Sequence, residues 1–94
     1  MVSKKEVVSV MSQLSSMLNK TNPNADLTNY VDQSLQTIKK SDGVAFTGQL
    51  QYFFNHAPIV KFSNNIKLTS EEQALWNKLF SLNELGNNLW GASL

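Results

Sequence analysis

The segment that decides the fold runs from residue 65 to residue 85 and reads NIKLTSEEQALWNKLFSLNEL. Thr69 and Glu72 have the spacing of a capping box, in which each side chain bonds the other residue's backbone N–H at the start of a helix. Glu71 and Glu72 also place negative charge in the first turn, where the helix dipole favours it. Apolar residues then recur every three or four positions, at Leu75, Trp76, Leu79, Phe80, Leu82 and Leu85. This spacing predicts a helix over residues 70–85, ended by Gly86 and followed by a short tail over 87–94.

Two further helices are predicted upstream of this segment. Ser3 and Glu6 form a second capping box, and an apolar stripe from Val7 to Leu18 predicts a helix over residues 4–19. A turn with Pro23 suited to the first helical position precedes a helix over residues 24–40. That helix ends in two lysines, which complement the negative end of the helix dipole.

The segment over residues 44–62 carries Phe46, Leu50 and Phe53 at helical spacing and contains Pro58. Proline removes a backbone donor and clashes with the preceding turn, so we expect a kink near Pro58, or a break over residues 55–57. A short strand over residues 59–62 is the competing interpretation. No other part of the sequence offers it a partner strand.

Four amphipathic helices joined by short loops bury their apolar stripes most simply against one another. The sequence therefore predicts an all-α protein, an antiparallel up-down-up-down four-helix bundle. We expect a single domain over residues 1–94, because a chain of this length forms one core.

The composition narrows the classes of function. The 94 residues carry a net charge of +1 and no Cys, which leaves no disulfide or thiolate metal site. All eight basic residues are Lys, and without Arg the bidentate recognition of phosphate and guanine is weakened. The apolar runs are too short and too polar for a membrane span or a secretory signal. We expect a cytoplasmic protein.

Reactive residues do not cluster in the sequence. His56 is the only histidine, and neither Cys nor a group of carboxylates accompanies it, so we predict no metal site, no cofactor and no catalytic residue. Glu71 and Glu72 are adjacent on a helix and point about 100° apart, so they make a poor acid–base pair. We attribute the run Tyr52, Phe53, Phe54 to core packing, with Tyr52 at the boundary, rather than to a ligand site.

The segment from Asn65 to Trp76, followed by Leu79 and Leu82, resembles the enterocin A-type immunity proteins of class IIa bacteriocin producers in lactic acid bacteria and streptococci. In that family the fourth helix follows a loop whose pattern is Ile or Val, any residue, Phe or Leu, Thr, any residue, Glu, and then Glu or Gln. The resemblance implies a four-helix cytosolic protein, not an enzyme, that confers resistance to a pore-forming antimicrobial peptide. Its implied partner is the membrane component of the mannose phosphotransferase permease once the bacteriocin has engaged it. The brief tail and low basic charge depart from better-known members and fit an orphan member, encoded without a toxin beside it.

Partner choice in the family is attributed to the C-terminal half, which here points to the loop before the fourth helix and to the tail. The partner-binding residues we predict are Lys61, Asn64, Asn65, Lys67, Asn87, Asn88, Leu89 and Trp90. Trp90 lies outside every apolar stripe, so it either covers the core or is an exposed aromatic contact of the kind enriched at binding hot spots.

The alternative is a small helical DNA-binding regulator, or a protein adaptor, of phage or plasmid origin. Residues 41–43 are the only candidate turn of a helix-turn-helix. The helix after it would offer Gln49, Gln51 and Asn55 to bases, without Arg to support them.

Overall fold

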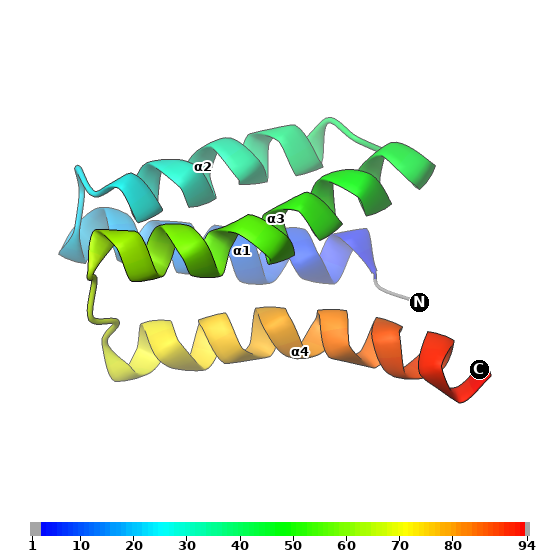
Figure 1. Cartoon of the computed structure of the whole chain (residues 1–94). Coiled ribbons are helices and arrows are strands. Elements are labelled where there is room, and N and C mark those ends of the chain that lie inside the picture. Colours follow the sequence, from blue (N-terminus) through cyan, green and yellow to red (C-terminus); the bar gives the residue numbers. More distant parts are fainter. Residues whose placement is uncertain (1–2, 94) are drawn as a thin grey trace.

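The computed structural model describes the backbone of residues 3–93 and the side chains of residues 3–82 (Figure 1). In this part of the chain the regular structure is helical throughout. The four helices are α1 (Lys4–Thr21), α2 (Asp26–Lys39), α3 (Gly43–Asn64) and α4 (Ser70–Ser93). The predicted all-α class and the number of helices are confirmed.

The connections lie at the two ends of a molecule about 40 Å long. In Figure 1 the α1–α2 and α3–α4 loops share one end, which we call the loop end. The α2–α3 turn lies at the other end, beside the start of α1, and we call this the turn end. α1 packs against both α2 and α4, and α2 packs against α3.

The apolar stripes predicted from the sequence meet in one core. Val7, Met11, Leu14 and Leu18 of α1 are fully buried, as their three- and four-residue spacing predicts. Burying such a side chain completely stabilises a fold by roughly 1.5–3 kcal/mol each, before the entropy of ordering the chain is subtracted. The remaining buried apolar residues are Val10, Leu27, Val31, Leu35, Ile38, Phe46, Leu50, Phe53, Phe54, Ala57, Trp76, Leu79 and Leu82.

α3 and α4 face each other through aromatic rings. The ring of Phe80 lies 5.0 Å from that of Phe54 and 6.2 Å from that of Phe53, measured between centroids. Trp76 stacks on Phe80 at 4.7 Å. Tyr52, in contrast, is 57 % exposed. In the run Tyr52, Phe53, Phe54 the two phenylalanines therefore belong to the core and Tyr52 lies at its boundary, as predicted.

The predicted break and the alternative strand around Pro58 are both wrong. α3 continues through Pro58 to Asn64 without a change of secondary structure. A proline inside a helix costs about 3 kcal/mol or more. Here its ring lies on the exposed side while Phe54 and Ala57, on the opposite face, are buried. Core packing on both sides of the proline therefore outweighs the local cost.

The predicted end of the fourth helix is also wrong. α4 passes through Gly86 and reaches Ser93, so residues 87–93 belong to the helix and not to a separate tail. Glycine inside a helix costs only about 1 kcal/mol relative to alanine, and no proline follows it. The cost of Gly86 therefore does not end the helix.

Smaller corrections concern the other helix ends. α2 begins at Asp26 rather than at residue 24, so Pro23 lies in the loop and not at the first helical position. α1 extends to Thr21, two residues beyond the predicted end. None of the helices, over the residues described, is long and apolar enough to cross a bilayer.

Candidate interaction site

Potential metal ligands do not cluster in the described part of the molecule. Its histidine and acidic residues form no group of three or more that could hold a metal ion. The His56 ring stacks on Tyr52 at 3.9 Å, and its Nδ1 lies 2.8 Å from the Tyr52 carbonyl oxygen. These contacts hold the imidazole along its own helix and place it beside no nucleophile.

The capping box at the start of α4 forms as predicted and extends to a third helix. The Thr69 N–H donates to Glu72 Oε1 at 2.9 Å, and the Glu72 N–H donates to Thr69 Oγ1 at 3.2 Å. The Thr21 hydroxyl, at the end of α1, donates to Glu72 Oε2 at 2.5 Å. Glu72 is fully buried, so this carboxylate fastens the loop end of α1 to the start of α4.

Asn64, predicted to bind a partner, is engaged inside the molecule. Its Oδ1 accepts the Leu27 N–H at 3.0 Å. α2 needs this bond because its own cap residue, Ala25, offers no side-chain acceptor. A residue at the end of α3 thus caps the start of α2, which is a structural task.

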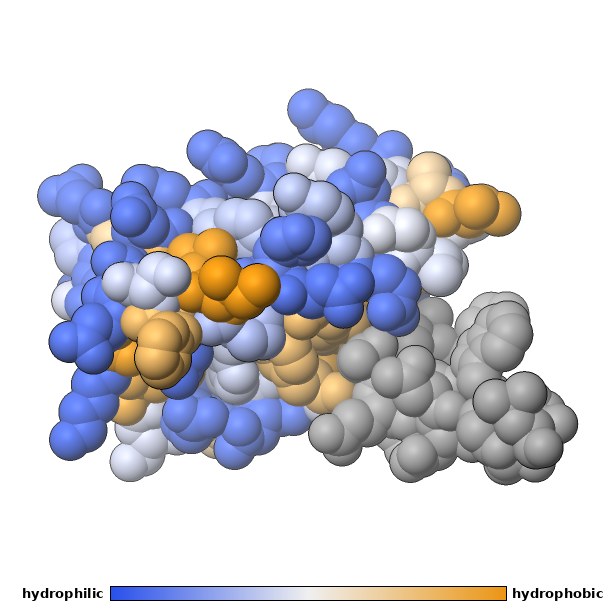
Figure 2. Space-filling view, viewed as in Figure 1, coloured by the Kyte–Doolittle hydropathy of each residue, from blue (hydrophilic) through white to orange (hydrophobic). Residues whose placement is uncertain are grey.

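Two apolar side chains are exposed on α3 near the loop end. Phe62 is 88 % exposed and Ile59 is 62 % exposed. Residues three apart on a helix share a face, so these side chains form one apolar spot, which is visible in Figure 2 at the loop end of the molecule. A Phe this exposed is unusual, because aromatic side chains contribute large areas to cores and interfaces.

Polar and basic residues follow this spot directly along the chain. Asn65 ends α3 in a left-handed conformation, with φ of 53°, and is exposed. Lys67 is exposed in the loop before α4. We name Ile59, Phe62, Asn65 and Lys67 the loop-end surface. It combines apolar side chains with an ammonium group at its rim, a pattern typical of protein interfaces.

Lys61, the other predicted lysine, lies half-buried beside this surface. Its Nζ is 5.8 Å from the centre of the Trp76 ring, which places the charge over the ring face. This contact connects α3 to α4. Because the Lys61 ammonium group already interacts with the Trp76 ring, it is less available to a partner.

The predicted residues of the tail are not brought to the loop end. Asn87, Asn88, Leu89 and Trp90 belong to the last turns of α4, and their side chains lie outside the described residues. A helix of 24 residues is about 36 Å long. The predicted partner-binding residues therefore fall into two separate groups, one at the end of α3 and in the loop before α4, the other in the last turns of α4.

Ile59 and Phe62 were missed as site residues by the sequence analysis. The sequence pattern does indicate their exposure. The core-facing stripe of this helix contains Phe46, Leu50 and Phe53. Helical spacing places Ile59 and Phe62 on a different face from this stripe. The expected break at Pro58 prevented this prediction. If the helix is broken there, helical spacing no longer indicates on which face the following residues lie.

A groove between α2 and α3 contains one unusual hydroxyl. Tyr30 Oη is shielded from solvent and has no hydrogen-bond partner of good geometry among the described residues. Burial raises the pKa of the Tyr30 hydroxyl above its usual 10.0, and the nearby Ser34 side chain offsets part of that rise. The groove is lined by both helices, with Gln33, Gln49 and Tyr52 near Tyr30.

We expect Tyr30→Phe to reduce the loss of stability at alkaline pH. A raised pKa means that the folded state holds the proton more tightly, so this contribution is present below pH 10 and is lost as pH rises through the folded-state pKa. Urea unfolding at pH 8 and pH 10.5 measures the difference between the two proteins. At pH 8 the variant should lie within about 1 kcal/mol of the parent, since the hydroxyl has no good partner to lose. An equal alkaline loss in both proteins would contradict the assignment to Tyr30.

Comparisons with models of known protein families, with curated proteins and with solved structures give no match to this chain.

Proposed function

We propose that this protein is a cytoplasmic bacteriocin immunity protein, which protects its cell from a pore-forming class IIa bacteriocin by binding the peptide's membrane receptor complex. The observation that carries the proposal is the loop-end surface, where Phe62 and Ile59 are exposed beside Lys67. This surface overlaps the start of the segment from Asn65 to Trp76 that resembles the immunity family, because Asn65 and Lys67 belong to both. We also propose that the four helices form the antiparallel up-down-up-down bundle expected for such a protein.

The mechanism we propose is binding without catalysis. A protein that binds one state of its target more tightly than another shifts the target toward that state by the difference in binding free energy. Here the favoured state is the receptor with its pore closed. The partner implied by the resemblance is the membrane component of the mannose phosphotransferase permease with bound bacteriocin.

The contact chemistry follows from the side chains. Phe62 would enter an apolar depression on the partner, Ile59 would extend the apolar contact, and Lys67 would face a carboxylate at the rim. Aromatic residues at the centre of an interface often contribute 2 kcal/mol or more of its binding free energy. Rim lysines contribute more to the rate of association than to the affinity.

We expect Phe62→Ala to abolish most protection while leaving the fold intact. Expression of the chain in a sensitive strain, followed by killing assays with a panel of class IIa peptides, measures protection. Because Phe62 is 88 % exposed, the variant should unfold within about 0.5 kcal/mol of the parent. The matched control is Tyr52→Ala, which removes an exposed ring from the same helix outside the loop-end surface and should retain protection.

Two results would contradict the proposal in different ways. Unchanged sensitivity of the strain to every peptide, with the chain present at a normal level, would remove the immunity function. Protection by the parent that is equally strong in Phe62→Ala would retain the function and exclude the loop-end surface. A gel-shift assay at low salt tests the alternative of a DNA-binding regulator with the same purified protein.

A further inference from the structure

We propose that the turn end of the molecule is a docking surface for an anionic lipid bilayer. The residues involved are Lys5, Lys39, Lys40 and Val44, which we name the basic end. This inference does not depend on the proposed function, because it rests on a different end of the molecule and on charge alone.

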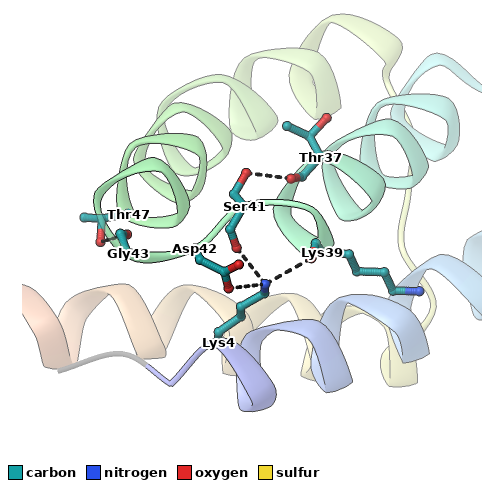
Figure 3. A network of polar contacts seen from close by, with 7 residues as sticks. All are labelled: Lys4, Thr37, Lys39, Ser41, Asp42, Gly43 and Thr47. Atoms are coloured by element: carbon teal, nitrogen blue, oxygen red, sulfur yellow. Dashed lines mark hydrogen bonds and ion pairs between the residues drawn. The ribbon is translucent and has the colours of Figure 1, made fainter.

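The basic end is assembled by Lys4. Its Nζ donates to the Lys39 carbonyl at 3.0 Å, to the Ser41 carbonyl at 2.6 Å and to Asp42 Oδ1 at 2.9 Å (Figure 3). These three bonds hold the start of α1 against the end of α2. The chain neighbours Lys5 and Lys40 are thereby brought to the same end of the molecule, although they are far apart in the sequence.

The charges at this end are unequal. Lys4 and Asp42 neutralise each other in the one ion pair found among the described residues. Lys5, Lys39 and Lys40 are all exposed, and the Lys39 side chain points away from the Lys4 network in Figure 3. Among the described residues of this end, the exposed carboxylate of Glu6 opposes these three cations. Three of the eight lysines of a chain with a net charge of +1 are therefore gathered and free at one end.

An apolar side chain projects at the same end. Val44 is 90 % exposed in the first turn of α3, two residues after Asp42. Its neighbour Ala45 is exposed as well. Figure 2 shows this second apolar spot at the turn end, separate from the one at the loop end. Lysines around a small apolar projection match the boundary between lipid headgroups and acyl chains.

The composition of the basic end favours lipid headgroups over other anionic partners. Lysine is a compact point charge that suits a diffuse negative surface, whereas arginine forks and aromatic rings are used for nucleic acid. None of the four residues of the basic end is an arginine or an aromatic residue.

Docking by the basic end has a geometric consequence. The long axis of the molecule is about 40 Å, and the loop-end surface lies at its opposite end. A molecule held by its lysines would present the loop-end surface to the water-exposed parts of neighbouring membrane proteins.

Sedimentation with vesicles tests the proposal without any bacteriocin. We expect the purified chain to bind vesicles of equal parts phosphatidylcholine and phosphatidylglycerol at low ionic strength, and not vesicles of phosphatidylcholine alone. Each lysine near an anionic surface contributes about fivefold to the partition coefficient, so the variant K5Q/K39Q/K40Q should bind about 100-fold more weakly. The Lys4 bonds remain in this variant, because Lys39 contributes only its carbonyl.

The matched control is K20Q/K67Q/K78Q, which has the same net charge of −2 (+1 − 3) and loses only exposed lysines elsewhere. This control should bind within about threefold of the parent. Equal weakening in the two variants would show that only net charge matters and would overturn the proposal. Failure of the parent to sediment, or tighter binding to duplex DNA than to the vesicles, would overturn it as well.

Discussion

Replacing Phe53 by alanine is expected to lower the free energy of unfolding by about 4 kcal/mol. Phe53 is 1 % exposed. The centroid of its ring lies 5.9 Å from that of Tyr30 on α2 and 6.2 Å from that of Phe80 on α4. The substitution removes the apolar surface that α3 shares with both neighbours and leaves a cavity that a close-packed core refills only in part. Urea unfolding followed by circular dichroism measures the loss.

The matched control is the same substitution on the same helix at Phe62. Because Phe62 is 88 % exposed, its removal should change the free energy of unfolding by no more than about 0.5 kcal/mol. The pair separates loss of packing from loss of an aromatic residue in α3. A similar loss in both variants would mean that Phe62 is buried in solution, which would contradict the loop-end surface.

Glu72→Ala is expected to cost about 3 kcal/mol. The side chain is fully buried and accepts hydrogen bonds from the Thr69 N–H and the Thr21 hydroxyl. Truncation leaves the part-buried Thr69 N–H without its acceptor, and an unsatisfied group costs about 1–3 kcal/mol when it is buried, whereas the Thr21 hydroxyl can still donate to the Met17 carbonyl. It also removes the capping box of α4, a loss of roughly 1 kcal/mol.

Two milder variants locate the source of this loss. Glu72→Gln keeps an oxygen for the Thr69 N–H and can donate its amide to Thr21 Oγ1, whose single hydroxyl hydrogen can then turn to the Met17 carbonyl 3.1 Å away. It should therefore cost less than half as much as the alanine variant. Thr21→Val keeps the capping box and removes the link between α1 and Glu72, together with the local contacts of Thr21 Oγ1 to the Met17 carbonyl and the Asn22 amide. An alanine variant as stable as the parent would show that the buried carboxylate contributes nothing to the α1–α4 contact.

The parts of the fold that could be predicted are those set by short-range chemistry. The capping box of Thr69 and Glu72 is readable because its partners are three residues apart. The stripe of α1 is readable because a helix places residues three and four apart on one face. Both depend on neighbours along the chain, and both are confirmed.

The parts that could not be predicted depend on residues distant in the sequence. The cap of α2 comes from Asn64, 37 residues beyond its partner Leu27. The end of α2 carries Lys39 in its last turn, as predicted, but it is also bonded by Lys4, which is 35 residues away in the sequence. A pattern within one helix does not indicate which end of another helix it will contact. The exposure of Ile59 and Phe62 could not be predicted for the same reason. The face on which they lie depends on whether packing against the other helices keeps α3 intact through Pro58.

The amino-acid sequence by itself determined that the chain is all helical, where most of its helices begin, and which side chains enter the core, since spacing and capping are properties of a single helix. Only the tertiary structure decided that α3 survives its proline, that Lys5, Lys39 and Lys40 share one end, and that Phe62 faces outward at the other. These outcomes are set by free energies of contact between helices. Contacts across the core contribute several kcal/mol, which exceeds the local preference of any single residue in the chain.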